Sequence, residues 1–158
     1  CAKFRKGHFE GVLDVMNKLT KIVKPKKIFM GEKDFQQLYL VKKELEKKYK
    51  TKVVPCKTVR DRNNVALSSR NLLLNKSSLI IAAKIYKKIV DIKKNIKNKR
   101  NISSFLNLKK KELKNNYKIK IDYLELRNIK NLKLSNTKNN SRLFIAYYLK
   151  NVRLIDNL

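Results

Sequence analysis

Two short segments hold the residues whose types and spacing could do chemistry. Gly31-Glu32-Lys33-Asp34 follows an apolar run and precedes an amphipathic stretch, so we expect it at a strand-to-helix turn. There, free backbone N–H groups and the positive end of a helix dipole face any ligand in the crevice. Ser68-Ser69-Arg70 joins two hydroxyls to a guanidinium, a donor set that suits phosphate oxygens. Together the two segments predict a nucleotide site and favour ATP chemistry.

The residues of the first segment also have plainer interpretations. Lys33 could reach a triphosphate, but most lysines in a chain with 41 Lys+Arg residues are solvated surface residues. Asp34 could bind ribose hydroxyls or a metal-bound water. Asp is also a frequent helix N-cap, and Gln37 stands where it could complete a capping box, so the local pattern favours capping. Gln37 could instead hold a polar substrate.

The second segment and the remaining reactive side chains leave similar alternatives. Ser68-Ser69 by itself is more typical of a turn than of a ligand site. Because Arg70 follows directly, a turn and an anion site are equally compatible with the segment. His8, the one histidine, has no Ser/His/Asp arrangement around it and is interpreted as structural. Cys1 and Cys56 have no partner base and no metal-ligand spacing, so we assign neither a nucleophile nor a metal site.

Apolar periodicity predicts alternating helices and strands over the first sixty residues. Helices are expected over residues 8–23 and 35–48, and short strands over 27–30 and 52–56. This order is typical of α/β crossovers on a parallel sheet, where ligands bind at the carboxyl ends of the strands. The turn at residues 31–34 follows the first strand and is therefore placed for binding.

Beyond this region the pattern changes. Residues 60–71 show no apolar period and are expected to form a loop, followed by helices over 76–98 and from 102 to about 113. Strands are then predicted over residues 119–126, 143–149 and 152–155. The predicted fold class is α/β: the C-terminal part of a Rossmann-like nucleotide-binding domain over 1–58, a hinge and phosphate-contacting loop over 59–71, and a small α+β domain over 72–158.

The composition is dominated by positive charge. The 158 residues carry 41 Lys+Arg against 12 Asp+Glu, a net charge of +29. Such a balance can indicate nucleic-acid binding, but the lysines are spread along the whole chain and Arg is scarce. Joint enrichment in Lys and Asn fits codon drift in an AT-rich genome, so we expect no specific nucleic-acid partner. The longest apolar stretch, residues 143–149, is too short for a membrane helix, and two isolated cysteines fit a cytoplasmic location.

Several segments resemble one enzyme family in order and spacing. They are Arg5–Val12, Gly31–Leu38, Leu67–Asn71, Asp122–Arg127 and Arg153–Asn157, so the likeness covers essentially the whole chain, and Gly31–Leu38 is its most specific part. They resemble the pantothenate synthetase family. The resemblance implies an ATP-dependent ligase that condenses (R)-pantoate with β-alanine through a pantoyl-adenylate, releasing AMP and diphosphate. It also implies Mg²⁺ and a homodimer.

The same resemblance implies roles for individual residues. Lys33 would lie on the phosphates, Asp34 toward the ribose, Val59 near the adenine, and Gln37 would hold pantoate. The full set implied to contact ATP is Gly31, Glu32, Lys33, Asp34, Val59, Leu67, Ser68, Ser69 and Arg70. The family's His-x-x-His motif and general-acid histidine do not occur in this sequence, so we assign no catalytic residue and expect negligible turnover from the chain alone.

Some positions depart from the family pattern. The chain does not begin with Met, and we expect it to be the C-terminal portion of a longer protein. Asn63-Asn64 stands where the family has Asp-Gly, and Lys6 stands where it has Pro. Asn64 suits a Gly position if its φ is positive, whereas the carboxylate lost at Asn63 puts the loop geometry in question. Two alternatives therefore stay open: a basic nucleic-acid-binding module, or an inactive remnant of the ligase.

Overall fold

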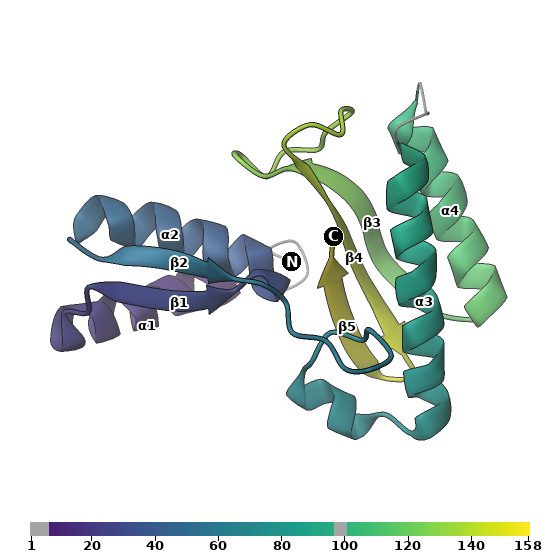
Figure 1. The fold of residues 1–158 in the computed structure, drawn as a ribbon, viewed down its shortest axis with the longest axis horizontal. Helices are drawn as coiled ribbons and strands as arrows, with labels where there is room; N and C mark the ends of the chain where they lie inside the picture. The colour runs from purple at the N-terminus through teal and green to yellow at the C-terminus, as the bar shows by residue number, and fades with distance from the viewer. Residues whose placement is uncertain (1–6, 97–100) are drawn as a thin grey trace. The chain divides into compact units, whose positions relative to one another are not determined.

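Two compact units make up the chain, Cys1–Thr58 and Val59–Leu158. The computed structural model describes residues 7–96 and 101–158 (Figure 1). Cys1, Arg5 and Lys6 lie outside the described residues, as do the last two residues of the helix predicted over 76–98. Among the described residues, no helix combines the length and apolar character needed to cross a membrane.

The first unit is a helix–strand–helix–strand unit. Its elements are α1 (His8–Val23), β1 (Lys27–Gly31), the 3₁₀ turn η2 (Glu32–Asp34), α2 (Phe35–Lys48) and β2 (Lys52–Cys56). The two strands pair in parallel, with Ile28 opposite Val53 and Gly31 opposite Cys56. This confirms the predicted α/β crossover, because parallel neighbours need a connection such as α2 between them.

A small apolar core fixes this arrangement. Leu38, Val41 and Leu45 recur on one face of α2 and are at most 4% exposed. Together with the buried Val53 of β2 they form the core, against which Val12 and other residues of α1 pack. Because α2 is held along its length in this way, its first turn stays at the carboxyl end of β1.

The second unit pairs two helices with an antiparallel sheet. It contains the 3₁₀ turn η3 (Ser69–Leu73), α3 (Lys76–Asn95), α4 (Ile102–Tyr117), β3 (Lys120–Asn128), β4 (Ser141–Leu149) and β5 (Val152–Asn157). The sheet order is β3-β4-β5. α4 packs on β3 and α3 on β4, so the helices cover one side of the sheet (Figure 1). The sequence therefore predicted the fold class correctly.

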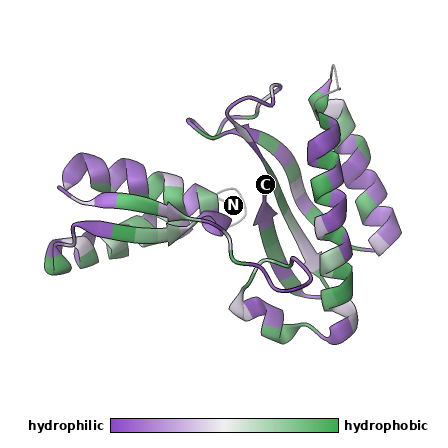
Figure 2. Ribbon diagram, in the orientation of Figure 1, coloured by the Kyte–Doolittle hydropathy of each residue, from purple (hydrophilic) through white to green (hydrophobic). Residues whose placement is uncertain are grey.

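The core of this unit lies between α3, α4 and the central strand. Ile85 and Ile89 from α3 meet Leu143 and Ile145 from β4 in one cluster, and each is at most 2% exposed. Hydrophobic residues run along β4 in Figure 2, as expected for the middle strand of three. The β-branched Ile side chains favour both strand packing and a stiff core.

The predicted loop over residues 60–71 differs from expectation at its end. Ser69–Leu73 forms the 3₁₀ turn η3. The cause is local: the Ser68 Oγ accepts a hydrogen bond from the backbone N–H of Arg70 at 3.2 Å and caps the turn. A Ser before a short polar run therefore started a helical turn in a stretch that has no apolar period.

Candidate functional site

The turn after β1 gathers the first group of predicted site residues. β1 ends at Gly31, η2 follows directly, and α2 begins at Phe35. Since Gly31 pairs with Cys56, both parallel strands end at this edge, the edge at which α/β sheets bind ligands. A Cβ placed on Gly31 would meet no described atom within 4 Å. The backbone at the end of β1 therefore faces open space.

Asp34 occupies the N-cap position of α2 but does not act as a cap. Its side chain makes no capping hydrogen bond with the described residues, and its φ of −93° and ψ of 50° differ from the usual extended N-cap conformation. The predicted capping box with Gln37 is therefore wrong. The reason is that η2 precedes the helix and turns the backbone at Asp34 before α2 begins. Its exposed carboxylate is not committed to holding the helix start.

Lys33 and Gln37 lie on either side of this helix start. Lys33 is the middle residue of η2 and Gln37 stands on the first turn of α2, and both side chains are half-buried. The seven-residue segment Gly31–Gln37 thus places an ammonium, two carboxylates and two amides beside a helix N-terminus. Such a group can bind an anion through the ammonium and the helix N–H groups, and hydroxyls through the carboxylates.

The second group of predicted residues follows a tight turn in the other unit. Arg60 and Ala66 form an antiparallel bridge, and the Asp61 N–H donates to the Val65 carbonyl at 2.9 Å. Asn64 has a φ of 66° inside this turn. The condition under which Asn64 suits a Gly position, a positive φ, is therefore met, and Asn is among the non-Gly residues that adopt this conformation most readily.

A carboxylate still closes the turn although position 63 is Asn. The Asp61 Oδ1 accepts hydrogen bonds from the backbone N–H groups of Asn63 at 2.8 Å and Val65 at 2.9 Å. Asn63 takes part through its main chain, and its side chain is exposed. The turn is therefore well hydrogen-bonded with Asn at position 63.

Ser68, Ser69 and Arg70 leave this turn on a partly exposed surface. Ser68 caps η3, so the turn interpretation of Ser68 is confirmed, whereas Ser69 and Arg70 are exposed. Two apolar neighbours are exposed as well, Val59 at 67% and Leu67 at 51%. Exposed apolar side chains beside a hydroxyl and a guanidinium offer the two kinds of contact that a nucleoside phosphate needs.

The family follows from comparison with known proteins. The family model described as Pantoate-beta-alanine ligase matches residues 1–158. The chain belongs to the pantoate-β-alanine ligase family. It therefore shares its family with enzymes named as ligases, and the resemblance found in the sequence is confirmed.

Curated relatives show how much of the family's length is present. A pantothenate synthetase of Flavobacterium psychrophilum is 37% identical over 162 residues, which cover 99% of this chain and 56% of the relative. One of Francisella tularensis subsp. mediasiatica is 36% identical, covering 98% of this chain and 51% of the relative. The chain thus spans about half the length of the curated relatives it matches.

Solved structures of the pantoate-β-alanine ligase family have the same fold. The chain matches a pantothenate synthetase of Thermus thermophilus with a TM-score of 0.89 at 29% identity, covering 99% of this chain and 58% of that one. It matches a pantoate-beta-alanine ligase of Francisella tularensis, complexed with beta-gamma ATP and beta-alanine, with a TM-score of 0.73 at 35% identity, covering 99% and 52%.

The Arg60–Asp156 ion pair, which joins the turn at residues 60–66 to β5, was not predicted from the sequence. The Arg60 guanidinium donates to both carboxylate oxygens of Asp156, at 2.7 and 2.8 Å. Both side chains are largely buried, at 16% and 13% exposed. Ninety-six positions separate them, so no local spacing links them. The only available signal was that Asp156 lies in a segment that resembles the family.

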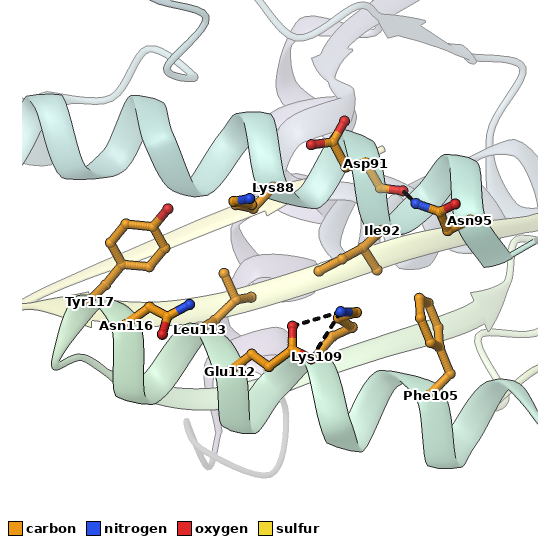
Figure 3. Close-up of a pocket in the computed structure, with 10 residues that line it drawn as sticks. All are labelled: Lys88, Asp91, Ile92, Asn95, Phe105, Lys109, Glu112, Leu113, Asn116 and Tyr117. Carbon is orange, nitrogen blue, oxygen red and sulfur yellow. Dashed lines mark hydrogen bonds and ion pairs between the residues drawn. The ribbon is translucent and has the colours of Figure 1, made fainter.

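A pocket of about 360 Å³ lies elsewhere, between α3 and α4 (Figure 3). Ile92 and Leu113 form its apolar floor, and the Lys109–Glu112 ion pair stands at its side. None of the sequence-predicted site residues lines it.

His8 begins α1, with its ring centroid 5.2 Å from that of Phe9. The part of the chain that the structure describes contains no cluster of three His, Cys, Asp or Glu side chains that could hold a metal ion.

Proposed function

We propose that this chain carries the C-terminal part of an ATP-dependent ligase that condenses (R)-pantoate with β-alanine to pantothenate. The observation that carries the proposal is the Gly31–Asp34 turn at the carboxyl ends of two parallel strands, in a chain that belongs to the pantoate-β-alanine ligase family. The relative complexed with beta-gamma ATP and beta-alanine supports ATP and β-alanine as substrates.

The proposed reaction has two steps. The pantoate carboxylate attacks the α-phosphorus of ATP, so that a pantoyl-adenylate forms and diphosphate leaves. The β-alanine amine then attacks the activated acyl carbon and AMP leaves. Both steps move negative charge onto phosphate oxygens, so preorganised cations and N–H dipoles are the main contribution that a protein can make.

We assign each candidate residue a role that its chemistry supports. Lys33 and Arg70 bind phosphate oxygens, Asp34 accepts from the ribose hydroxyls, and Gln37 holds pantoate through its amide. The residues proposed to contact ATP are Gly31, Glu32, Lys33, Asp34, Val59, Leu67, Ser68, Ser69 and Arg70. We assign no general acid or base to this chain and expect negligible ligation by it alone.

The proposal includes Mg²⁺, which would neutralise charge on the triphosphate. Mg²⁺ usually binds through one or two carboxylates plus substrate phosphates and keeps several waters. The described residues offer no three-ligand cage, and we assign Mg²⁺ no ligand from this chain. We further propose a cytoplasmic homodimer.

ATP binding by the 158-residue chain tests the site. We expect Lys33→Ala and Arg70→Ala each to weaken MgATP binding about 10-fold or more, since a hydrogen bond to a charged group contributes about 1.5–3 kcal/mol. Isothermal titration calorimetry measures the affinity. Lys43→Ala and Lys87→Ala are matched controls, because they remove exposed helix lysines. Equal losses from all four variants would show that ATP senses only the overall charge.

A further inference from the structure

We propose that the Arg60–Asp156 ion pair positions the phosphate segment, residues 66–71, for anion binding. The proposal rests on the function proposed above, because Ser68, Ser69 and Arg70 of this segment are assigned to ATP there. Arg60 and Asp156 are positioning residues in this proposal, with no contact to ATP themselves. The turn, α3, η3 and β5 all lie in the second unit.

The ion pair fastens the turn to the sheet. Its two hydrogen bonds, at 2.7 and 2.8 Å, use both guanidinium Nη atoms and both carboxylate oxygens. The same Arg60 Nη1 donates to the carbonyl of Asn64 at 3.1 Å. Asp156 stands on β5, and its Oδ1 also accepts from the Asn157 N–H at 2.8 Å. A bidentate pair of this kind fixes direction as well as distance.

A third element holds the guanidinium in place. The Arg60 Cζ lies 4.4 Å from the centre of the Tyr86 ring of α3, within cation–π distance. Burial opposes the charge of Arg60, but the hydrogen bonds and charge of Asp156 outweigh burial, so the pKa of Arg60 is raised. A buried guanidinium with these partners has one favourable placement, and removing Asp156 would leave its charge uncompensated.

Backbone hydrogen bonds connect Arg60 and its neighbour Val59 to the phosphate segment. Arg60 bridges to Ala66, and the Leu67 N–H donates to the Val59 carbonyl at 3.0 Å. The Asn71 Nδ2 then donates to the Ala66 carbonyl at 3.1 Å, closing the segment on itself. η3, which contains Ser69 and Arg70, contacts β5, the strand that carries Asp156 (Figure 1). Both ends of the segment thus depend on the same anchor.

Asp156→Asn tests the proposal against a matched variant. Asn has the same shape but no charge, so Arg60 loses its ionic partner. Asp122→Asn is the control: Asp122 on β3 pairs with Arg153 on β5 at 2.8 Å and is 4% exposed, and among the described residues its carboxylate has no hydrogen bond to the turn at residues 60–66. Both variants should lower the melting temperature, because each leaves a buried Arg uncompensated.

The two variants should differ in the phosphate segment. We expect Asp156→Asn to speed amide hydrogen exchange at Val65, Leu67 and Asn71 about 10-fold or more and to weaken MgATP binding about 10-fold, whereas Asp122→Asn does neither. Asp156→Glu, which keeps the charge, should restore part of both. Equal exchange and equal affinity in the two Asn variants would overturn the proposal, and so would faster exchange with unchanged affinity.

The two readouts separate this inference from the proposed function. If the unsubstituted chain binds no MgATP, the proposed function of this chain is contradicted. Hydrogen exchange then still decides whether the ion pair fixes the segment. If the unsubstituted chain binds MgATP and Asp156→Asn alters neither readout, the site stands and the positioning role is wrong.

Discussion

At the scale of single residues, Glu46 ties α2 to β2 by its carboxylate. Its Oε1 accepts from the Val53 N–H at 2.9 Å and lies 3.1 Å from the Lys42 Nζ. Burial alone would raise the pKa of Glu46, but the Val53 N–H and the Lys42 ammonium outweigh burial and lower it. Folding therefore stabilises the ionised form of the Glu46 carboxyl relative to the unfolded chain.

This lowered pKa predicts a pH-dependent contribution to stability. A carboxyl whose pKa is depressed by folding stabilises the folded state above its unfolded pKa and loses that contribution as the pH falls through the folded pKa. Glu46→Gln can keep the Val53 hydrogen bond but cannot titrate. The difference in unfolding free energy between the two proteins should therefore shrink between about pH 5 and pH 3.

Urea denaturation at several pH values measures this difference. It should stay below about 1 kcal/mol, because the Glu46 side chain is 34% exposed and solvent screens the pair. A difference that stays constant from pH 6 to pH 3, at about its neutral value, would contradict the assignment of the titrating group.

At the scale of elements, the start of α3 depends on one side chain. The Asn75 Oδ1 accepts from the Ser78 N–H at 2.9 Å and from the Ser77 hydroxyl at 2.9 Å. Asn101 caps α4 in the same way, through the Ser104 N–H at 3.0 Å. Both helices of the second unit therefore begin with an Asn cap, which satisfies an N–H that the helix itself cannot.

Asn75→Ala should destabilise the second unit by about 1 kcal/mol, and Asn75→Asp should be close to neutral. The physical reason is that Ala leaves the Ser78 N–H without its acceptor, whereas Asp supplies one. Chemical denaturation measures the change. Asn115→Ala, at an exposed position inside α4, is the control and should not destabilise, since Ala is the best helix former. Equal effects of the two Ala variants would argue against the cap.

At the scale of the whole molecule, the net charge of +29 sets non-specific association. A surface this basic should bind duplex DNA weakly and without sequence preference. We expect that DNA affinity to fall about 10³-fold or more between 50 and 200 mM salt if six or more phosphates are contacted. MgATP affinity should fall far less, because only a few cations are involved.

Fluorescence anisotropy with a labelled duplex, run beside the ATP titration, separates the two activities. Lys33→Ala should leave DNA binding nearly unchanged and should weaken ATP binding. Tight, sequence-selective DNA binding that survives 200 mM salt would instead favour the nucleic-acid-binding module over the ligase.

The order of the helices and strands was predictable because apolar periodicity depends on residues only a few positions apart. The helix over 35–48 and the strand over 52–56 have the predicted bounds, since α2 turns Leu38, Val41 and Leu45 and β2 turns Val53 toward the core of their unit. The sequence also showed that Asn64 could take a positive φ, because Asn tolerates that conformation, and the structure shows that it does so. The predicted ligand contacts of residues 31–34 and 67–70 stay predictions.

The sequence by itself therefore determined the elements, the family and the segments that hold the candidate residues. The structure showed that Asp34 is not a cap, because η2 turns the backbone locally, and only the tertiary packing decided that Arg60 lies against Asp156. The physical reason is the sequence separation over which each kind of interaction acts. Periodicity and turn propensity act over a few residues, whereas the partner of Arg60 is set by how β5 pairs and where α3 packs, contacts that form only when the whole unit folds.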